Sequence, residues 1–329
     1  MRALFFILSG VSILTSINAY ADYFDVQAPP SVKSYNFSAV SIPDTVGATT
    51  NDLDGNAFMY TIHYSETMGA TLGLKVNGTL LGDGKTYATN NPGVGIQYTF
   101  HLMKTQGLSP TGDIKAPPFV YTSVGHGTDD GVITSQSLNV WYRLVRISEF
   151  VPSGAITTVP DVSYIITNPA GEGEPVITGT ILSGMGAQPK VVACTINAPT
   201  EIKLSPLYGK DIRAGALNVT DAQKITLTNC PGAINGIDYN FSASYGTNGA
   251  AIGVLKTATG EGYAKEVYVQ IQNADGTPHI INGVIPLEGY NGSGDYAIPD
   301  FKVAYYVYDP SIVTAGKVKS AIELKVTYN

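Results

Sequence analysis

The sequence is poor in charged residues and has no cluster of one sign. Charged residues make up 14% of the chain, its formal net charge is −7, and lysine and arginine form no run. A nucleic-acid or anionic-membrane partner needs a basic surface, so neither is expected. After residue 21 no apolar run approaches the roughly 20 residues of a membrane-spanning helix, so membrane insertion is not expected either.

Short motifs of the common enzyme classes are also missing. The chain contains no G-x-S-x-G nucleophile motif, no phosphate-binding glycine loop and no H-E-x-x-H. Glu172 and Glu174 share a loop, which is no basis for a hydrolytic carboxylate pair. We therefore expect no enzymatic activity and no cofactor.

Helical periodicity sustained over three turns is absent beyond residue 21, and strand patterns take its place. Segments such as AFMYTIHYS, GIQYTFHLM and SLNVWYRLVRI alternate in polarity, with turn signals such as Asn77-Gly78 between them. This pattern is typical of antiparallel sandwiches. The sequence predicts an all-β protein.

The N-terminus has the features of a secretory signal. Met1-Arg2 is followed by an apolar stretch, and Ala19-Tyr20-Ala21 fits the small-x-small cleavage pattern. Residues 1–21 are therefore predicted to be removed. The remaining chain is too long for one ordinary domain and suits two.

Cysteine is nearly absent, with Cys194 and Cys230 as the two copies. In a secreted chain an isolated pair most simply forms a disulfide, which stabilises by roughly 3–4 kcal/mol in the chain-entropy model. A zinc site needs further ligands at close spacing, and neither cysteine has a histidine nearby. The disulfide is the favoured interpretation.

A break in the strand pattern marks the expected domain boundary. Residues 183–190, SGMGAQPK, contain two glycines and a proline between strand-like segments. We predict a first domain at 22–185, a linker at 186–190 and a second domain at 191–329.

The last residues, AIELKVTYN at 321–329, alternate strictly and predict a half-buried strand. Gly316 and Val318 share the parity of its apolar face. The apolar residues of that face within the strand are Ile322, Leu324, Val326 and Tyr328.

Residues 191–329 resemble a pilin domain of the bacterial chaperone–usher pathway. The resemblance rests on a cysteine in the first strand, its partner in ITLTNCP (225–231), the stretch AKEVYVQIQNADGTP (264–278), a glycine fourteenth from the end and a penultimate tyrosine. It implies an incomplete immunoglobulin-like sandwich whose open groove accepts a strand from another protein. The residues implied at that edge are Gly316, Val318, Ile322, Leu324, Val326 and Tyr328.

The resemblance also implies partners and a position in a fibre. A periplasmic chaperone would supply the strand first, an outer-membrane usher would mediate export, and the next fimbrial subunit would donate the final strand. The segment DYFDVQAPPSVKSY after the signal shows no long alternating run to donate in turn. The layout is similar to two-domain fimbrial tip adhesins, which predicts a receptor-binding first domain, often sugar-binding, at the fimbrial tip on the cell surface.

Two other functions remain open. One is a structural tip or initiator pilin whose first domain caps the fibre without a receptor. The other is a secreted β-sandwich of unrelated adhesive or enzymatic use. The first domain lacks the cysteines of the type 1 fimbrial pattern, so no receptor-binding residue is carried over from that family.

Receptor-contact candidates in the first domain come from its most polar loop, GHGTDDG at 125–131. Carboxylates there would accept sugar hydroxyls, and nearby aromatic rings would offer a stacking face. A glycine-rich turn with solvated carboxylates and a core tryptophan is the simpler interpretation. The candidates are Tyr121, His126, Asp129, Asp130 and Trp141.

Three of the four histidines, His63, His101 and His126, fall in the first domain. Three histidines can hold Zn²⁺ with a water as fourth ligand, and at least one related fimbrial adhesin type depends on a metal. No two of these histidines share a short motif, so we predict no metal and keep this zinc site as the alternative.

Overall fold

The structure, a computed structural model, describes the backbone of residues 25–27, 31–64, 70–103, 112–114, 119–123, 132–167 and 177–329. Side chains are described for 31–56, 74–100, 139–165 and 178–329. The predicted signal, residues 1–21, lies outside these ranges. Within them the regular structure is almost all strand, so the all-β prediction is confirmed. Three one-turn 3-10 helices occur, η1 (Gly209–Asp211), η2 (Ala250–Ile252) and η3 (Pro310–Ile312).

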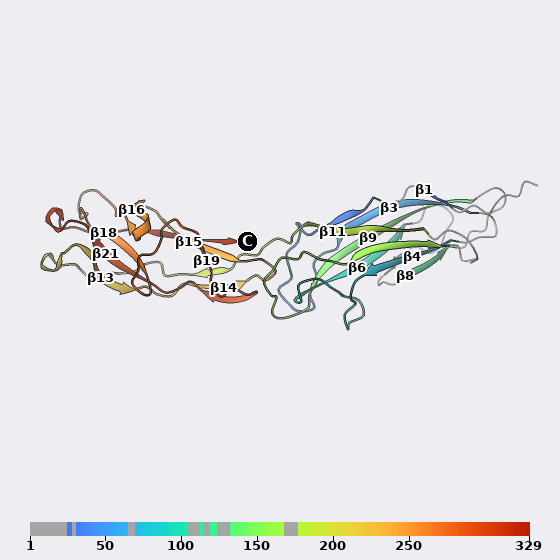
Figure 1. The fold of residues 1–329 in the computed structure, drawn as a ribbon, viewed down its shortest axis with the longest axis horizontal. Coiled ribbons are helices and arrows are strands. Elements are labelled where there is room, and N and C mark those ends of the chain that lie inside the picture. The colour runs from blue at the N-terminus through green and yellow to red at the C-terminus, as the bar shows by residue number, and fades with distance from the viewer. Residues whose placement is uncertain are drawn as a thin grey trace, which may run out of the picture.

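No helix in these ranges has the length and apolar character to cross a membrane. Figure 1 shows two β-rich domains placed end to end, with the C-terminus between them.

The first domain contains two sheets. One has the strand order β1-β3-β9-β6-β5, and β7 also pairs with β6. Its strands are β1 (Asp25–Gln27), β3 (Leu53–Tyr64), β5 (Tyr87–Ala88), β6 (Val94–Met103), β7 (Gly112–Ile114) and β9 (Val132–Arg146). The other has the order β2-β11-β10-β4-β8. Its strands are β2 (Lys33–Asn36), β4 (Ala70–Asn77), β8 (Phe119–Ser123), β10 (Asp161–Thr167) and β11 (Ile177–Ala187).

Aromatic side chains fill the core between these sheets. Tyr35 packs edge-on against Tyr142, with ring centroids 4.8 Å apart. The Tyr35 and Tyr98 hydroxyls lie 2.8 Å apart, and both donate to the carbonyl of Pro160. Burial raises the pKa of both phenols, so they stay neutral donors. A buried hydroxyl without an acceptor would lower the stability of the fold. The Pro160 carbonyl supplies that acceptor, so the core can contain tyrosine rings together with their hydroxyl groups.

The second domain is built from three sheets. The first, in the order β12-β14-β20, contains β12 (Thr195–Asn197), β14 (Thr226–Cys230) and β20 (Gly294–Ala297). The second, in the order β13-β21-β18-β17-β16, contains β13 (Gly215–Asp221), β21 (Phe301–Val307), β18 (Tyr268–Asn273), β17 (Val254–Leu255) and β16 (Thr247–Gly249). The third, in the order β19-β15-β22, contains β19 (Ile285–Pro286), β15 (Ile237–Ala243) and β22 (Ile322–Tyr328).

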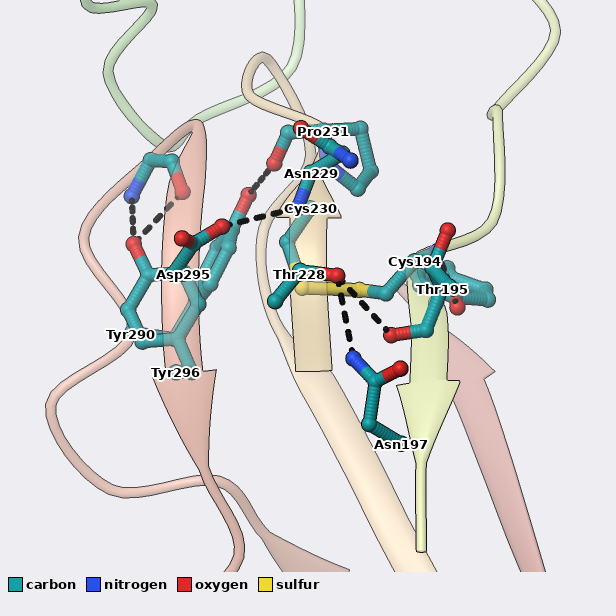
Figure 2. The surroundings of a disulfide bond; sticks show 12 residues. Cys194, Thr195, Asn197, Thr228, Asn229, Cys230, Pro231, Tyr290, Asp295 and Tyr296 are labelled. Carbon is teal, nitrogen blue, oxygen red and sulfur yellow. Dashed lines mark hydrogen bonds between the residues drawn. A yellow bond between two sulfur atoms is a disulfide. The ribbon is translucent and has the colours of Figure 1, made fainter. Parts of the chain in front are cut away.

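The predicted disulfide is present. Cys194 and Cys230 are bonded, with Cα atoms 4.3 Å apart. Figure 2 shows the bond joining the residue before β12 to the last residue of β14. On the far side of β14, the Asn229 N–H donates to the Asp295 carboxylate at 2.9 Å. The disulfide therefore fastens the start of the second domain to a strand that is itself held on both sides.

The two domains meet through a backbone joint, which we define as residues 151–155 against 232–235 and 291–293. Four N–H···O=C bonds of 2.8 Å cross it, donated by Ser153, Gly154, Ala233 and Ser293. Ala233 is also buried in the hydrophobic core of the first domain. A Cβ on Gly232 would lie 2.0 Å from the Val151 carbonyl oxygen, so the two backbones touch. Such a joint opposes the relative motion that two domains have by default.

The predicted linker, residues 186–190, is tied to the first domain. Strand β11 extends to Ala187, and the Lys190 N–H donates to the Val40 carbonyl at 2.7 Å. Gly186 lies against β2, where a Cβ would come 3.0 Å from the Tyr35 carbonyl oxygen. This glycine thus serves close packing, and the stretch between Lys190 and Cys194 is the short connection to the second domain.

Candidate functional site

Strand β22 alternates as its sequence predicts, and one of its edges is open. It pairs antiparallel with β15 over seven residues, from Ile237↔Tyr328 to Ala243↔Ile322. Glu323, Lys325 and Thr327 are exposed, while the apolar residues between them are half-buried. In the described part of the chain β15 is the one strand paired with β22. The N–H and C=O groups of its second edge therefore remain available to another strand.

A groove of about 1380 Å³ lies along the segment that leads into β22, and Ile322 is the residue of β22 that lines it. One wall is the extended segment 199–207 and the other is 313–322. Its floor consists of buried side chains from β17, β18 and β21 and the turn before β18, namely Leu255, Val267, Val269, Ile271, Val303 and the half-buried Tyr305. A volume above the usual 300–1,000 Å³ of small-molecule pockets suits an extended chain better than a compact ligand.

Both walls repeat the same alternation. On one, Ile202 and Leu204 are half-buried while Lys203 between them is exposed. On the other, Val318 and Ile322 are half-buried while Lys317 and Lys319 are exposed. All four apolar side chains pack on the hydrophobic core of the second domain. Each wall therefore turns a row of apolar side chains toward the core.

Gly316 belongs to the wall formed by residues 313–322, at the point where this wall passes the turn at 262–264. The Lys317 N–H donates to the Gly262 carbonyl and the Lys317 carbonyl accepts from Ala264, at 2.9 and 3.0 Å. A Cβ on Gly316 would come 2.3 Å from the Ala264 nitrogen. Glycine is therefore required by close backbone approach at this end of the groove. Val318, two residues on, packs on the second domain's core.

Beyond the groove lining, β22 continues to the domain joint. The Tyr328 hydroxyl accepts a hydrogen bond from the Cys194 N–H at 2.7 Å. Asn329 exchanges backbone hydrogen bonds with Gly236, next to the joint loop 232–235. The C-terminal end of β22 is thus held beside the domain joint, whereas Gly316 lies in the part of the chain that lines the groove.

The receptor-contact candidates fall mainly outside the described residues. His126, Asp129 and Asp130 lie there, and Tyr121 is described by its backbone alone, in β8 opposite Leu72. Trp141 is a half-buried residue of β9 whose register partners are Asp54 and Thr99. The structure does not bring these five residues together as a site, and their role remains a prediction.

The register of the first sheet bears on the zinc alternative. His63 pairs with Ile133 of β9 from one side, and His101 pairs with Asn139 from the other. Six residues along β9 correspond to about 20 Å between the two positions, whereas zinc–nitrogen bonds are about 2 Å. The register therefore argues against one ion held by both histidines. His126 is outside the described residues.

Sequence reasoning missed two parts of this region. The wall at 199–207 carries an alternating signal, E-I-K-L at 201–204, which is too short to stand out. The joint carries turn residues in PGAING at 231–236, but nothing in those letters shows what they contact.

Comparison with known proteins finds a family match for the second domain and the last strand of the first. Residues 177–329 match the family model described as fimbrial protein, which confirms the predicted resemblance. No curated protein matches the chain.

Solved structures give low similarities over long alignments. The CupB6 tip adhesin from Pseudomonas aeruginosa is 14% identical, covering 93% of this chain and 94% of that one, with a TM-score of 0.42. The chaperone–tip adhesion subunit complex CsuC–CsuE of Acinetobacter baumannii is 11% identical, covering 90% of this chain and 97% of that one, with a TM-score of 0.35. The P pilus rod subunit PapA is 18% identical, covering 43% of this chain and 94% of that one, with a TM-score of 0.32.

Proposed function

We propose, on the premise that residues 177–329 are a fimbrial-protein domain, that this protein is a chaperone–usher fimbrial tip adhesin. The second domain accepts a strand from another protein, and the first domain binds a receptor, with a host glycan as the expected class. The observation that carries the proposal is the open edge of β22 together with the groove along the segment 313–322 that leads into it, whose floor is apolar.

The open edge supports strand acceptance on physical grounds. An unpaired edge over apolar side chains invites pairing with another chain, and natural proteins normally cover or blunt it. An added strand would complete the backbone ladder of β22 and place alternate side chains over the floor. A periplasmic chaperone, followed by the neighbouring subunit, is the proposed source. The outer-membrane usher is the proposed export partner, and the cell surface the destination.

The first domain supports a separate role because its described core is closed. Within the described residues its two sheets bury their own aromatic side chains. A domain with its own core, held end-on to a strand-accepting domain, suits presentation of a receptor site. A fimbrial subunit of this layout has a structural and adhesive role, and we propose no enzymatic one.

Strand acceptance is tested with the full mature chain and a synthetic peptide of about 15 residues that alternates apolar and polar positions. We expect the peptide to raise the Tm of the second domain and to protect the β22 amides from hydrogen exchange. A peptide of the same composition without alternation is the control. Equal effects of the two peptides, or none from either, would remove the strand-acceptor role.

Receptor binding is tested with the peptide-complemented chain on a glycan array and on host cells. We expect selective binding that is lost in a variant carrying Asp129→Ala and Asp130→Ala. Asp44→Ala with Asp300→Ala is the matched control. Reproducible absence of binding to glycans and cells by the folded chain would favour the alternative, a structural subunit that caps the fibre.

A further inference from the structure

The groove differs from the rest of the protein in its charge. Its charged lining residues are one acid, Glu201, and three lysines, Lys203, Lys317 and Lys319. The whole chain has a formal net charge of −7. The groove lining thus carries more positive than negative side chains on a protein that is acidic as a whole. Such a lining favours a partner with negative charge.

The lysines lie on the rim, and the apolar residues between them point inward. Lys317 and Lys319 are exposed, while Val318 between them is half-buried against the core. Their backbone is fixed, since the Lys317 N–H donates to Gly262 and the Lys319 carbonyl accepts from Ala258. The two exposed lysines therefore stand on a backbone segment that is held in place.

Neighbouring acids compensate this charge little. Lys203 lies 3.6 Å from Glu201, but both side chains are mostly exposed, at 82% and 67%, so the pair is weak. Within the described residues no carboxylate forms an ion pair with Lys317 or Lys319. These two lysines are free to pair with a bound chain.

We propose that the groove selects a strand of a neighbouring fimbrial subunit whose outward-facing residues at the Gly316 end are acidic. This inference rests on the proposed strand-acceptor function and adds a charge pattern to it. Side chains directly opposite across paired strands interact, with opposite charges favourable and like charges unfavourable by comparable amounts. Each acid opposite a lysine therefore favours binding about two- to fivefold, and a lysine there opposes it.

The same charges act before contact. A positive rim raises the association rate of an acidic strand, and the effect falls as salt screens it, with a Debye length of about 10 Å at 0.1 M. The apolar floor of the groove contributes the same binding free energy to every strand that carries matching apolar residues. Lys317 and Lys319 then discriminate among such strands by the charge of their outward-facing residues.

The test uses the full mature chain and three synthetic peptides with identical inward apolar residues. Their outward residues nearest Lys317 and Lys319 are aspartate in one, serine in the next and lysine in the third. Association and dissociation are followed by fluorescence anisotropy at 20 mM and 500 mM NaCl. We expect the aspartate peptide to bind about tenfold tighter than the lysine peptide at low salt, and nearly equally at high salt.

A matched pair of variants separates the rim from overall charge. Lys317→Gln with Lys319→Gln should remove most of the difference between the peptides. Lys224→Gln with Lys302→Gln deletes two charges outside the groove lining and should leave the difference unchanged. Equal binding of the three peptides at low salt would overturn the charge preference while the strand-acceptor function stands. Failure of all three to bind would instead overturn the strand-acceptor function.

Discussion

Strands β9 and β22 have similar alternating sequences but very different surroundings. Strand β9 is paired on both edges, with β3 and β6, and its inward residues Val140, Tyr142 and Leu144 are 0–1% exposed. Strand β22 is paired on one edge in the described structure, and its inward residues are half-buried. Alternation therefore indicates which face of a strand turns inward, while the number of neighbours decides how completely that face is covered.

The comparison predicts where each domain is vulnerable. The first domain owes its stability to contacts within itself and at the joint. The second domain combines a disulfide, an open groove and a buried histidine, so its stability should respond to reduction, to an added strand and to pH.

Loss of the disulfide should have the largest effect on the second domain. Cys194→Ala with Cys230→Ala should destabilise the second domain by about 3–4 kcal/mol, because the unfolded chain regains the entropy of an open loop. Hydrogen exchange should show faster opening of β14 and β15 and little change in β9. Equal acceleration in both domains would mean that they unfold as one unit.

Matched leucine truncations sharpen the comparison directly. Leu144→Ala should cost about 2–5 kcal/mol whether or not a strand peptide is present, because it leaves a cavity in a closed core. Leu324→Ala should cost about 1 kcal/mol in the free chain, where the side chain is half-buried, and more with the peptide bound. Chemical denaturation with and without peptide measures both. A peptide-independent cost at Leu324 would contradict the open groove.

Gly316→Ala tests the close approach at the groove end. Its Cβ would meet the Ala264 nitrogen at 2.3 Å, and such overpacking costs about 1–3 kcal/mol. We expect a lower Tm for the second domain and weaker peptide binding. Gly82→Ala is the control, since its Cβ meets nothing within 4 Å. Similar behaviour of the two variants would remove the packing role of Gly316.

The smallest effect expected is a pH dependence from His279. Its ring is 5% exposed, packs against Phe241, and has one partner, Asn273 Oδ1 at 2.8 Å from Nδ1. Burial lowers the pKa of this imidazole below its usual 6.5, so the folded state holds it neutral. As pH falls, the imidazole is protonated in the unfolded chain before it is protonated in the folded one. The stability contributed by neutral His279 is therefore complete above pH 6.5 and is lost progressively below it. In His279→Gln, denaturation midpoints from pH 7.5 to 5 should show a shallower loss.

Local patterns predicted the elements that depend on neighbouring residues in the chain. The alternation at 322–328 and the isolated cysteine pair each carry their signal in a few letters, and the structure shows both the strand and the disulfide. The wall at 199–207 and the joint depend on contacts between distant segments, which leave no periodic pattern. Gly186 illustrates this limit. The sequence predicts it as the first residue of a linker, and the structure adds that it lets strand β11 pass close to Tyr35.

If the first domain binds a receptor, as proposed, the joint also sets the direction from which it does so. Two domains on a loose tether explore a wide cone of orientations, and most encounters with an immobilised receptor then present the wrong face. Here four backbone hydrogen bonds and the buried Ala233 fix that direction before any encounter. Because less orientational freedom is lost on binding, a modest receptor contact retains more of its favourable free energy.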